Sequence, residues 1–405
     1  MTAILEGVRI LEVAEQTFVP SAAALLSDYG AEVIKIEHHE RGDAMRGLMS
    51  AGILSTGGDV HALMEHSNRG KRSLGLNLAT DEGRTILYKL AATSDVFLHN
   101  KLPGVRKKLK IDVDDVRFHN PRIIYVSGTG QGERGPEADR GAYDSLAFWS
   151  RTGIAFATTR PEYGHLVSLP GPGFGDSLGG MTIAGGILGA LFHRERTGEA
   201  LTVDVSLLAT GMWAMGQSIA LSLLNNTPQA PLPLDMLHPN PLVGQYLTKD
   251  QRWFVISSLQ VGKYWPEFVT LLGKPEWADD PRFADHGSLM EHRTEAVALL
   301  KGFFADHTIA EIKEMLTNYS GQWAVAQNTL EVAEDPQTSA NGYLQECETA
   351  SGSPFKLVTA PVQFGGEPAP AHRAAEFNEH GDRILAELGL DGDTIIDLKV
   401  KGVVA

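Results

Sequence analysis

Short runs rich in strand-forming residues alternate with helical patterns over the first 130 residues of the chain. The strand-like runs lie at 8–13, 32–37, 73–78, 95–98 and 122–127, while helical patterns are clearest at 20–29 and 81–92. Strands that alternate with helices predict a largely parallel sheet covered on both faces, with ligands at the carboxyl ends of the strands. The pattern therefore predicts a Rossmann-like α/β domain.

The turn after the first predicted strand lacks the glycines of a dinucleotide site. An NAD or FAD site requires G-x-G-x-x-G there, but residues 14–20 read AEQTFVP. The glycine-rich segment 128–132 is followed by Glu133 and Pro136, which indicates a loop at a strand end. A nicotinamide dehydrogenase is therefore disfavoured. The motifs of a phosphate loop and of an acyl-hydrolase nucleophile elbow are also missing from the sequence.

Two proline- and glycine-rich stretches predict linkers and so divide the chain. They lie at 225–245 and 351–373. The expected parts are a large domain of residues 1–224, a smaller α+β domain of residues 246–350 and a C-terminal segment of residues 374–405. Within the smaller domain we expect a strand at 252–257 and helices at 264–272 and 293–305. A polar helix is expected at 374–388.

One acid stands before the most conspicuous predicted helix. A Pro/Gly loop ends at Gly175, Asp176 follows, and a small-residue apolar segment then continues to Gly198. Asp176 is placed where a helix N-cap belongs, and the helix dipole would keep its carboxylate ionised. An ionised acid in an uncrowded pocket can also attack an activated acyl group. Gly179 and Gly180 would leave room for a ligand or another backbone. The pattern alone does not decide whether Asp176 is a helix cap or a nucleophile.

Composition narrows the class of protein. The formal net charge of −15 over 405 residues argues against non-specific nucleic-acid binding. The longest uncharged apolar stretch, 181–192, is too short for a bilayer, and no secretory signal is visible. The single cysteine, Cys347, excludes an intrachain disulfide. A cytoplasmic protein without a membrane or nucleic-acid partner is expected.

The basic segments are candidates for binding an anion, and the histidines are candidates for binding a metal ion. The run KLPGVRKKLK at 101–110 is either a solvated surface segment or a binding site for a polyanion such as the phosphates of CoA. The same choice applies to NRGKR at 68–72. The histidines at 38–39 and the pair His61 and His66 lack the spacing of a helical zinc pair, so no metal site is expected.

The segment GFGDSLGGMTIAGGILGALFHRERTGEALTVDVSLL closely resembles the catalytic segment of the class III CoA-transferases. This family includes formyl-CoA and carnitine-CoA transferases and acyl-CoA racemases. Further matches follow the same order along the chain: LEGVRILEVAEQ, LLSDYGAEVIKIEHHERGD, NRGKRSLGLNLATDEG, NPRIIYVSGTGQGERGP, NPLVGQY, EVAEDPQTSANGYL and ILAELGL. The resemblance implies acyl-CoA and carboxylic acid substrates, and no cofactor beyond CoA. It also implies an interlocked homodimer, with residues 374–405 returning to the large domain.

The resemblance also implies roles for particular residues. It makes Asp176 the acyl-accepting nucleophile. It places CoA near Thr17, Phe18, His38, Leu76, Asn100, Lys101 and Lys108. The chain departs from the family pattern at His38, which replaces a more basic residue, at Ala79, which replaces a lysine, and at 99–104, where the aromatic ring of the turn is lost. Two phosphate-facing charges are thereby missing or weakened, and Lys101, Arg106 or Lys107 would compensate.

Tyr143 bears on the choice between the family's two reactions. Racemases of the family carry a Gly-His-Asp motif, and the matching residues here are Ala142-Tyr143-Asp144. A free tyrosine titrates near pH 10 and is a poor general base at neutral pH. We therefore expect a transferase that moves CoA from an acyl-CoA donor to a carboxylic acid through covalent aspartyl intermediates. An acyl-CoA racemase and a non-catalytic CoA-binding subunit are the alternatives.

Overall fold

The computed structural model describes residues 2–50, 58–233 and 237–405. The chain forms two compact units. Unit 1 comprises Met1–Ala230 and Pro336–Ala405, and unit 2 comprises Pro231–Asp335. Residues 336–350, which were expected in the smaller domain, pack with unit 1. Part of the expected linker 225–245, residues 234–236, lies outside the described residues.

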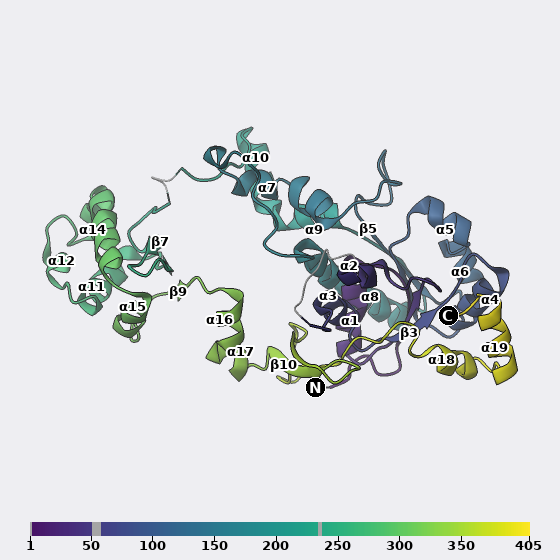
Figure 1. Cartoon of the computed structure of the whole chain (residues 1–405). Coiled ribbons are helices and arrows are strands. Elements are labelled where there is room, and N and C mark those ends of the chain that lie inside the picture. Colours follow the sequence, from purple (N-terminus) through teal and green to yellow (C-terminus); the bar gives the residue numbers. More distant parts are fainter. Residues whose placement is uncertain (1, 51–57, 234–236) are drawn as a thin grey trace. The chain divides into compact units, whose positions relative to one another are not determined.

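Unit 1 is built on a six-stranded parallel sheet (Figure 1). Its order is β3-β2-β1-β4-β5-β6. The strands are β1 (Arg9–Val13), β2 (Glu32–Glu37), β3 (Arg72–Gly75), β4 (Val96–His99), β5 (Ile124–Thr129) and β6 (Thr202–Ser206). This is the order of a doubly wound dinucleotide-type fold, in which the direction of winding reverses between β1 and β4. The predicted α/β fold with a parallel sheet is confirmed.

Alternate residues of the central strands β1, β2, β4 and β5 enter two separate cores, one on each face of the sheet. Ile10 and Val33 pack with α1 (Phe18–Asp28) and α8 (Phe174–Thr197). Leu11 and Ile34 pack on the other face, against α4 (Asp81–Ala91), α6 (Val113–His119), α18 (Gly381–Glu387) and α19 (Gly392–Val400). Adjacent apolar residues that serve opposite faces explain why these strands do not show a simple alternation of apolar and polar residues.

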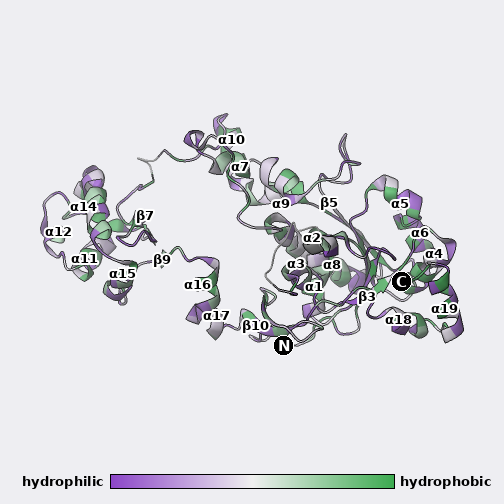
Figure 2. Cartoon of the chain, in the orientation of Figure 1, coloured by the Kyte–Doolittle hydropathy of each residue, from purple (hydrophilic) through white to green (hydrophobic). Residues whose placement is uncertain are grey.

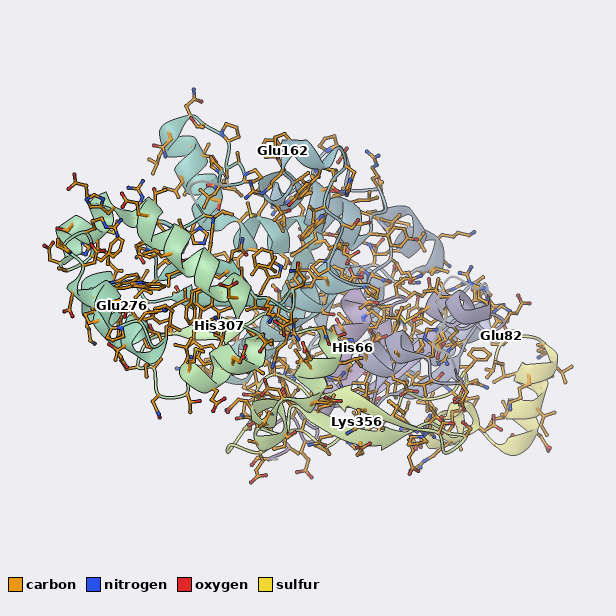
Figure 3. The ribbon with its side chains drawn as sticks, turned by 60° about the vertical axis from the view of Figure 1, so that its left-hand side comes forward. His66, Glu82, Glu162, Glu276, His307 and Lys356 are labelled. Carbon is orange, nitrogen blue, oxygen red and sulfur yellow. The ribbon has the colours of Figure 1, made fainter. Side chains whose placement is uncertain are left out.

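The remaining elements of unit 1 connect or cover the sheet. They are η1 (Ala44–Arg46), α2 (Gly47–Ser50), α3 (Ala62–Asn68), α5 (Pro103–Leu109), η2 (Ser145–Ser150), α7 (Ile154–Thr158), η3 (Pro161–Tyr163), α9 (Leu207–Ala214), α10 (Gly216–Asn225) and α17 (Pro336–Ala340). A hairpin of β10 (Leu344–Glu348) and β11 (Pro354–Val358) belongs here as well, with Lys356 of β11 paired to Glu346 at 2.9 Å (Figure 3). The linker expected at 351–373 therefore contains a strand.

The helix expected at 374–388 is shorter than predicted. Residues 374–380 run along the outer edge of β3, and α18 begins only at Gly381. The Asn378 side chain accepts a hydrogen bond from the Gly75 N–H at 3.0 Å, and the His380 N–H donates to the Ser73 carbonyl at 3.1 Å. These hydrogen bonds pair backbone groups of β3 at the edge of the sheet. The segment 374–380 therefore covers this edge before the helix begins.

Unit 2 is a small α+β structure. Its antiparallel sheet contains β7 (Val243–Leu247), β8 (Trp253–Ser257) and β9 (Trp323–Val325). Its helices are α11 (Val261–Leu271), α12 (Glu276–Asp279), α13 (His286–Glu291), α14 (Arg293–Asp306), α15 (Ile309–Met315) and α16 (Thr329–Glu334). The core contains several aromatic residues, including Tyr246, Phe254, Trp265, Phe268 and Phe304. Hydrophobic and hydrophilic residues both occur along α14 (Figure 2), which forms where the sequence predicts a helix at 293–305.

Within the described ranges, no single helix is long and apolar enough to cross a membrane. The bent pair α9 and α10 reaches the required length and composition only when the two helices are counted together.

Candidate active site

Two neighbouring cavities lie at the carboxyl ends of the parallel strands in unit 1. We call them the inner cavity, of about 130 Å³ and containing Asp176, and the outer cavity, of about 290 Å³ and containing His38 and Lys108. Glu15 and Lys101 line both cavities. These two residues follow β1 and β4, and ligands of doubly wound sheets bind where the winding reverses between such strands.

The inner cavity receives Asp176 from the first turn of α8. The helix begins at Phe174, and Gly173 is its N-cap with φ of 67°. The Ser177 N–H already donates to the Gly173 carbonyl at 2.8 Å. Asp176 is therefore the third residue of the helix, and the prediction that it occupies the N-cap is wrong. The left-handed Gly173 starts the helix earlier than the polar residues of the sequence suggest, because glycine adopts this conformation without strain.

Asp176 is not held ionised by the helix dipole as expected. Burial, and then the negative charge of Asp144, raise the pKa of Asp176 to about 7. Burial also raises the pKa of Asp144, while the backbone N–H groups of Ser145, Gly175 and Asp176 act to lower it. Asp144 thus faces the N–H groups at the start of α8. The part of the helix that would stabilise an ionised Asp176 is directed at a neighbouring acid instead.

The glycines near Asp176 allow two helices to approach each other. A Cβ on Gly179 would overlap the Phe18 ring of α1, and one on Gly180 would overlap the Ser21 side chain and lie 3.1 Å from the Ala22 nitrogen. Of the two expectations for these glycines, close approach of another backbone is the one observed. Close packing of α1 against α8 fixes Asp176 relative to the turn that follows β1.

A buried network of charges supports that turn. Gln16 has φ of 72°, an uncommon value for a residue other than glycine, and its N–H donates to Asp43 at 3.0 Å. Lys35 joins Asp43 and Glu12, each at 2.8 Å, and Lys71 contacts the second oxygen of Glu12 at 2.7 Å. Although burial acts to raise it, the pKa of Asp43 is lowered by Lys35 and by the Gln16 N–H. Gln16 also lines the inner cavity.

The structure brings most of the predicted CoA residues to these cavities. The inner cavity is lined by Phe18, Asn100 and Lys101, and the outer cavity by His38, Leu76, Lys101 and Lys108. Thr17 is buried and packs near Gly173, at the start of α8. The Asn100 amide donates to the Glu15 carbonyl at 2.7 Å and accepts from the Glu15 N–H at 3.3 Å. Asn100 therefore ties the turns after β1 and β4 together.

Arg106 is the exception among the predicted residues. Its guanidinium forms two hydrogen bonds with the Glu133 carboxylate, at 2.8 and 2.9 Å. Arg106 is outside the linings of the two cavities as the described residues define them. The structure therefore does not bring Arg106 to either cavity, and its pair with Glu133 already engages two of its donors.

Arg41, Gln16 and Asp144 complete the site and were not singled out in the sequence. Arg41 lines the outer cavity beside His38, whose pKa is lowered by burial and by Arg41 and His39. Arg41 lies within the matched stretch ending in HHERGD, so its charge was a readable signal. Asp144 matches the aspartate of the family's Gly-His-Asp motif, which was a readable signal, whereas Gln16 gave none, because its importance depends on which elements fold against it.

Among the described residues, the structure contains no group of three or more His, Cys, Asp or Glu side chains placed to hold a metal ion.

Comparisons with known proteins identify the class. A family model described as CoA-transferase family III matches residues 5–380. The chain is 30% identical over 403 residues to (R)-2-hydroxy-4-methylpentanoate CoA-transferase of Clostridioides difficile, covering 99% of each chain. It is 28% identical over 401 residues to cinnamoyl-CoA:phenyllactate CoA-transferase of Clostridium sporogenes, covering 98% of this chain and 96% of the relative.

Solved structures agree. A CAIB/BAIF family protein from Brucella suis has a TM-score of 0.81 and 28% identity, covering 96% of this chain and 100% of the other. The protein Rv3272 from Mycobacterium tuberculosis has a TM-score of 0.77 and 27% identity, covering 94% and 99%. The chain therefore belongs to CoA-transferase family III. It is an enzyme of CoA transfer, with CoA thioesters and carboxylic acids as its classes of substrate.

Proposed function

We propose that this enzyme transfers CoA through covalent intermediates on Asp176. The observation that carries the proposal is the position of Asp176 in the inner cavity, which shares Glu15 and Lys101 with the outer cavity. A thioester whose CoA lies in the outer cavity can present its carbonyl to the carboxyl group in the inner one. Ionised carboxylates form covalent acyl intermediates of this kind.

The reaction consists of four exchanges at carbonyl carbon. A carboxylate oxygen of Asp176 attacks the donor thioester, the C–S bond breaks, and CoA leaves as a thiolate with formation of a mixed anhydride. The thiolate attacks the Asp176 carbonyl, which gives an aspartyl-CoA thioester and releases the donor acid as a carboxylate. The acceptor carboxylate then attacks this thioester and releases the thiolate again. The thiolate finally attacks the acyl carbonyl of the new anhydride, which yields the new acyl-CoA and restores the Asp176 carboxylate.

We assign CoA to the outer cavity. Leu76, Leu78 and Val105 offer an apolar wall for the adenine ring, and Arg41 and Lys108 offer positive charge for the phosphates. His38 lines the same cavity. Thr17, Phe18, Asn100 and Lys101 lie along the path from there towards Asp176. Arg41 and Lys108 thus provide the charges that the sequence lacks at positions 38 and 79.

We also propose that two copies of the chain interlock as a homodimer. The chain passes between unit 1 and unit 2 twice, near residues 230 and 335. Each copy therefore has two connecting segments that the other copy could pass through. Large apolar side chains on α9 and α10 are exposed in the single chain, with Trp213 88% and Leu224 83% exposed. Such an exposed apolar surface supports an interface with a second copy. Mixing two differently tagged preparations tests this arrangement. Rapid exchange of folded subunits on dilution would contradict it.

The covalent step is tested with Asp176→Asn and Asp176→Ala. Both variants should fold and bind CoA but lose transfer by about a thousandfold or more, because neither offers a carboxylate. In the wild-type enzyme, hydroxylamine added with an acyl-CoA should convert Asp176 to a hydroxamate, located by peptide mass spectrometry. A wild-type rate in Asp176→Asn would leave this acid with a structural role only. Deuterium uptake at C2 of a 2-methylacyl-CoA that depends on Asp176 would indicate a racemase instead.

A further inference from the structure

Arg106 connects the helix beside the outer cavity to the loop beside the inner cavity. It lies on α5, which also carries Lys108 of the outer cavity. The Arg106 guanidinium binds the Glu133 carboxylate through two hydrogen bonds, at 2.8 and 2.9 Å. Glu133 belongs to the segment after β5, residues 130–141, which we call the β5 loop. The pair therefore joins elements from the two parts of the site.

Both ends of the β5 loop line the inner cavity. Gly130 and Gly141 are among its lining residues. A Cβ on Gly130 would lie 2.5 Å from the Cβ of Ala142, so the two ends of the loop meet without room for another side chain. Asp144, the neighbour of Asp176, follows two residues after Ala142. A shift of this loop would therefore change the inner cavity directly.

The β5 loop depends on polar contacts for its position. Its residues contribute no side chain to the two cores of unit 1, as the described residues define them. Glu137 of the loop pairs with Arg140 and Arg151, whose side chains are 72% and 45% exposed. The side chains of Arg106 and Glu133 are only 12% and 21% exposed. In the described chain, theirs is therefore the least exposed ion pair of the loop.

Loss of this pair would release the loop and not the helix. Leu109 of α5 and the adjacent Ile111 pack into the core that contains α4 and α6, which anchors the helix. Although burial acts to raise it, the pKa of Glu133 is lowered by Arg106 and by Ser127, whose hydroxyl donates to the same carboxylate. Without the guanidinium, a partly buried carboxylate is stabilised by reaching water. Because Glu133 has no core contacts to hold it, the loop would move with it.

We propose that Arg106 is a positioning residue for CoA transfer, whose pair with Glu133 holds the wall of the inner cavity in place relative to the CoA residues of the outer cavity. The inference rests on the proposed reaction at Asp176 and adds a contact on which its geometry depends. Neither Arg106 nor Glu133 touches the substrate. A thioester bound in the outer cavity reacts only when its carbonyl carbon meets the Asp176 oxygen, and a misplacement of about 1 Å costs on the order of a hundredfold in rate.

The test compares CoA binding with the first half-reaction, in which the donor thioester acylates Asp176 and no acceptor acid is needed. The donor is the thioester that gives the fastest hydroxylamine-trapped adduct at Asp176 among acetyl-CoA, butyryl-CoA, succinyl-CoA and cinnamoyl-CoA. Arg106→Met and Glu133→Gln should each lower the single-turnover rate at saturating donor by roughly ten- to a hundredfold. The Kd for CoA, measured by calorimetry, should stay nearly unchanged. Glu133→Gln keeps the size of the side chain and serves alone if Arg106→Met does not fold.

Further variants separate positioning from a loss of stability. The double variant of Arg106→Met and Glu133→Gln should be no slower than the slower single variant, because both changes remove the same link. Arg106→Lys keeps the charge and should recover part of the rate. Arg194→Met is the matched control, because Arg194 is 7% exposed and pairs at 2.7 Å with Asp95, which precedes β4 at the amino ends of the strands. It should lower stability and leave the single-turnover rate nearly unchanged.

Three results would overturn the proposal and leave the reaction at Asp176 intact. The first is a wild-type rate in Glu133→Gln. The second is a loss of CoA affinity as large as the loss of rate in Arg106→Met, which would make Arg106 a CoA ligand. The third is an equal loss of rate in Arg194→Met, which would make the effect one of stability. Absence of an adduct at Asp176 in the wild-type enzyme with all four donors would instead contradict the proposed reaction, and this inference with it.

Discussion

Asp144 and Asp176 form a pair of neighbouring carboxyl groups at the start of α8. Burial and the charge of Asp144 together raise the pKa of Asp176 to about 7. A nucleophilic carboxylate with such a pKa is protonated in part at neutral pH, but its ionised form is more basic than an ordinary aspartate. In the proposed reaction we therefore expect this pair to make the rate depend on pH in the physiological range, although neither member is a histidine.

The pH dependence of the first half-reaction tests this relationship. Only ionised Asp176 attacks, so the rate should rise with pH and level off above about 7. In Asp144→Asn the neighbouring charge is absent, so the pKa of Asp176 should fall and the rise should move to lower pH. Single-turnover rates between pH 5 and 9 measure the shift. An unchanged profile in Asp144→Asn would mean that the two acids do not interact.

The packing of α1 against α8 gives a prediction on stability. Gly180→Ala should lower the free energy of unfolding by about 1–3 kcal/mol, because the new methyl group meets the Ser21 side chain and the Ala22 backbone. Denaturant titration measures the effect.

Gly185→Ala, in the same helix, is the matched control. A Cβ on Gly185 would meet no atom of the chain within 4 Å, and alanine favours a helix over glycine by about 0.5–1 kcal/mol. The variant should be slightly more stable. A loss as large as that of Gly180→Ala would show that the contact with α1 is not the cause.

These cases also show what the sequence could and could not predict. The sheet was predictable, because its strands at 9–13 and 32–37 are short runs rich in β-branched and leucine residues, separated by helical patterns. The start of α8 was predicted too late, because the left-handed Gly173 sets it and no polar cap marks it. The shifted pKa of Asp176 could not be predicted, since Asp144 is 32 positions away and only the fold brings them together.

The same distinction applies to the basic residues. Lys108 and Arg106 have the same charge and belong to the same short helix. Only the folded chain shows that Glu133 has already engaged Arg106, whereas Lys108 lines the outer cavity. Sequence alone could identify the basic segment, but it could not identify which of its charges are free for a ligand.

The affinity for CoA should depend on Lys108 and not on Arg106. Lys108→Ala should weaken CoA binding by roughly tenfold or more, and the loss should shrink as salt is added, because a charge contact is screened. Arg106→Ala should leave CoA affinity nearly unchanged and reduce stability instead. Calorimetric titration at low and high salt measures the affinities. A larger effect of Arg106→Ala than of Lys108→Ala on CoA binding would reverse the assignment.

The buried network beneath Gln16 should matter strongly for folding. Lys35→Met leaves Asp43 without its cation and Glu12 with one partner fewer, at sites with almost no solvent. The expected loss in the free energy of unfolding is about 3–5 kcal/mol.

Lys401→Met is the surface control for the network. Lys401 pairs with Asp397 at 2.6 Å, but both side chains are more than half exposed, so its removal should cost less than about 1 kcal/mol. Equal losses in the two variants, measured by denaturant titration, would show that burial of the network adds nothing.

The outer edge of β3 carries a consequence for synthesis on the ribosome. The Asn77 N–H bonds to the Val403 carbonyl at 2.8 Å, and the Ala405 N–H bonds to the Gly75 carbonyl at 3.2 Å. Residues made more than 300 positions apart thus complete one strand edge next to the outer cavity. Unit 2 is continuous in sequence and can fold while the chain is still growing. The edge of unit 1 stays open until residues 403–405 have emerged from the ribosome, so this edge is the surface that a chaperone would most need to shield in the nascent protein.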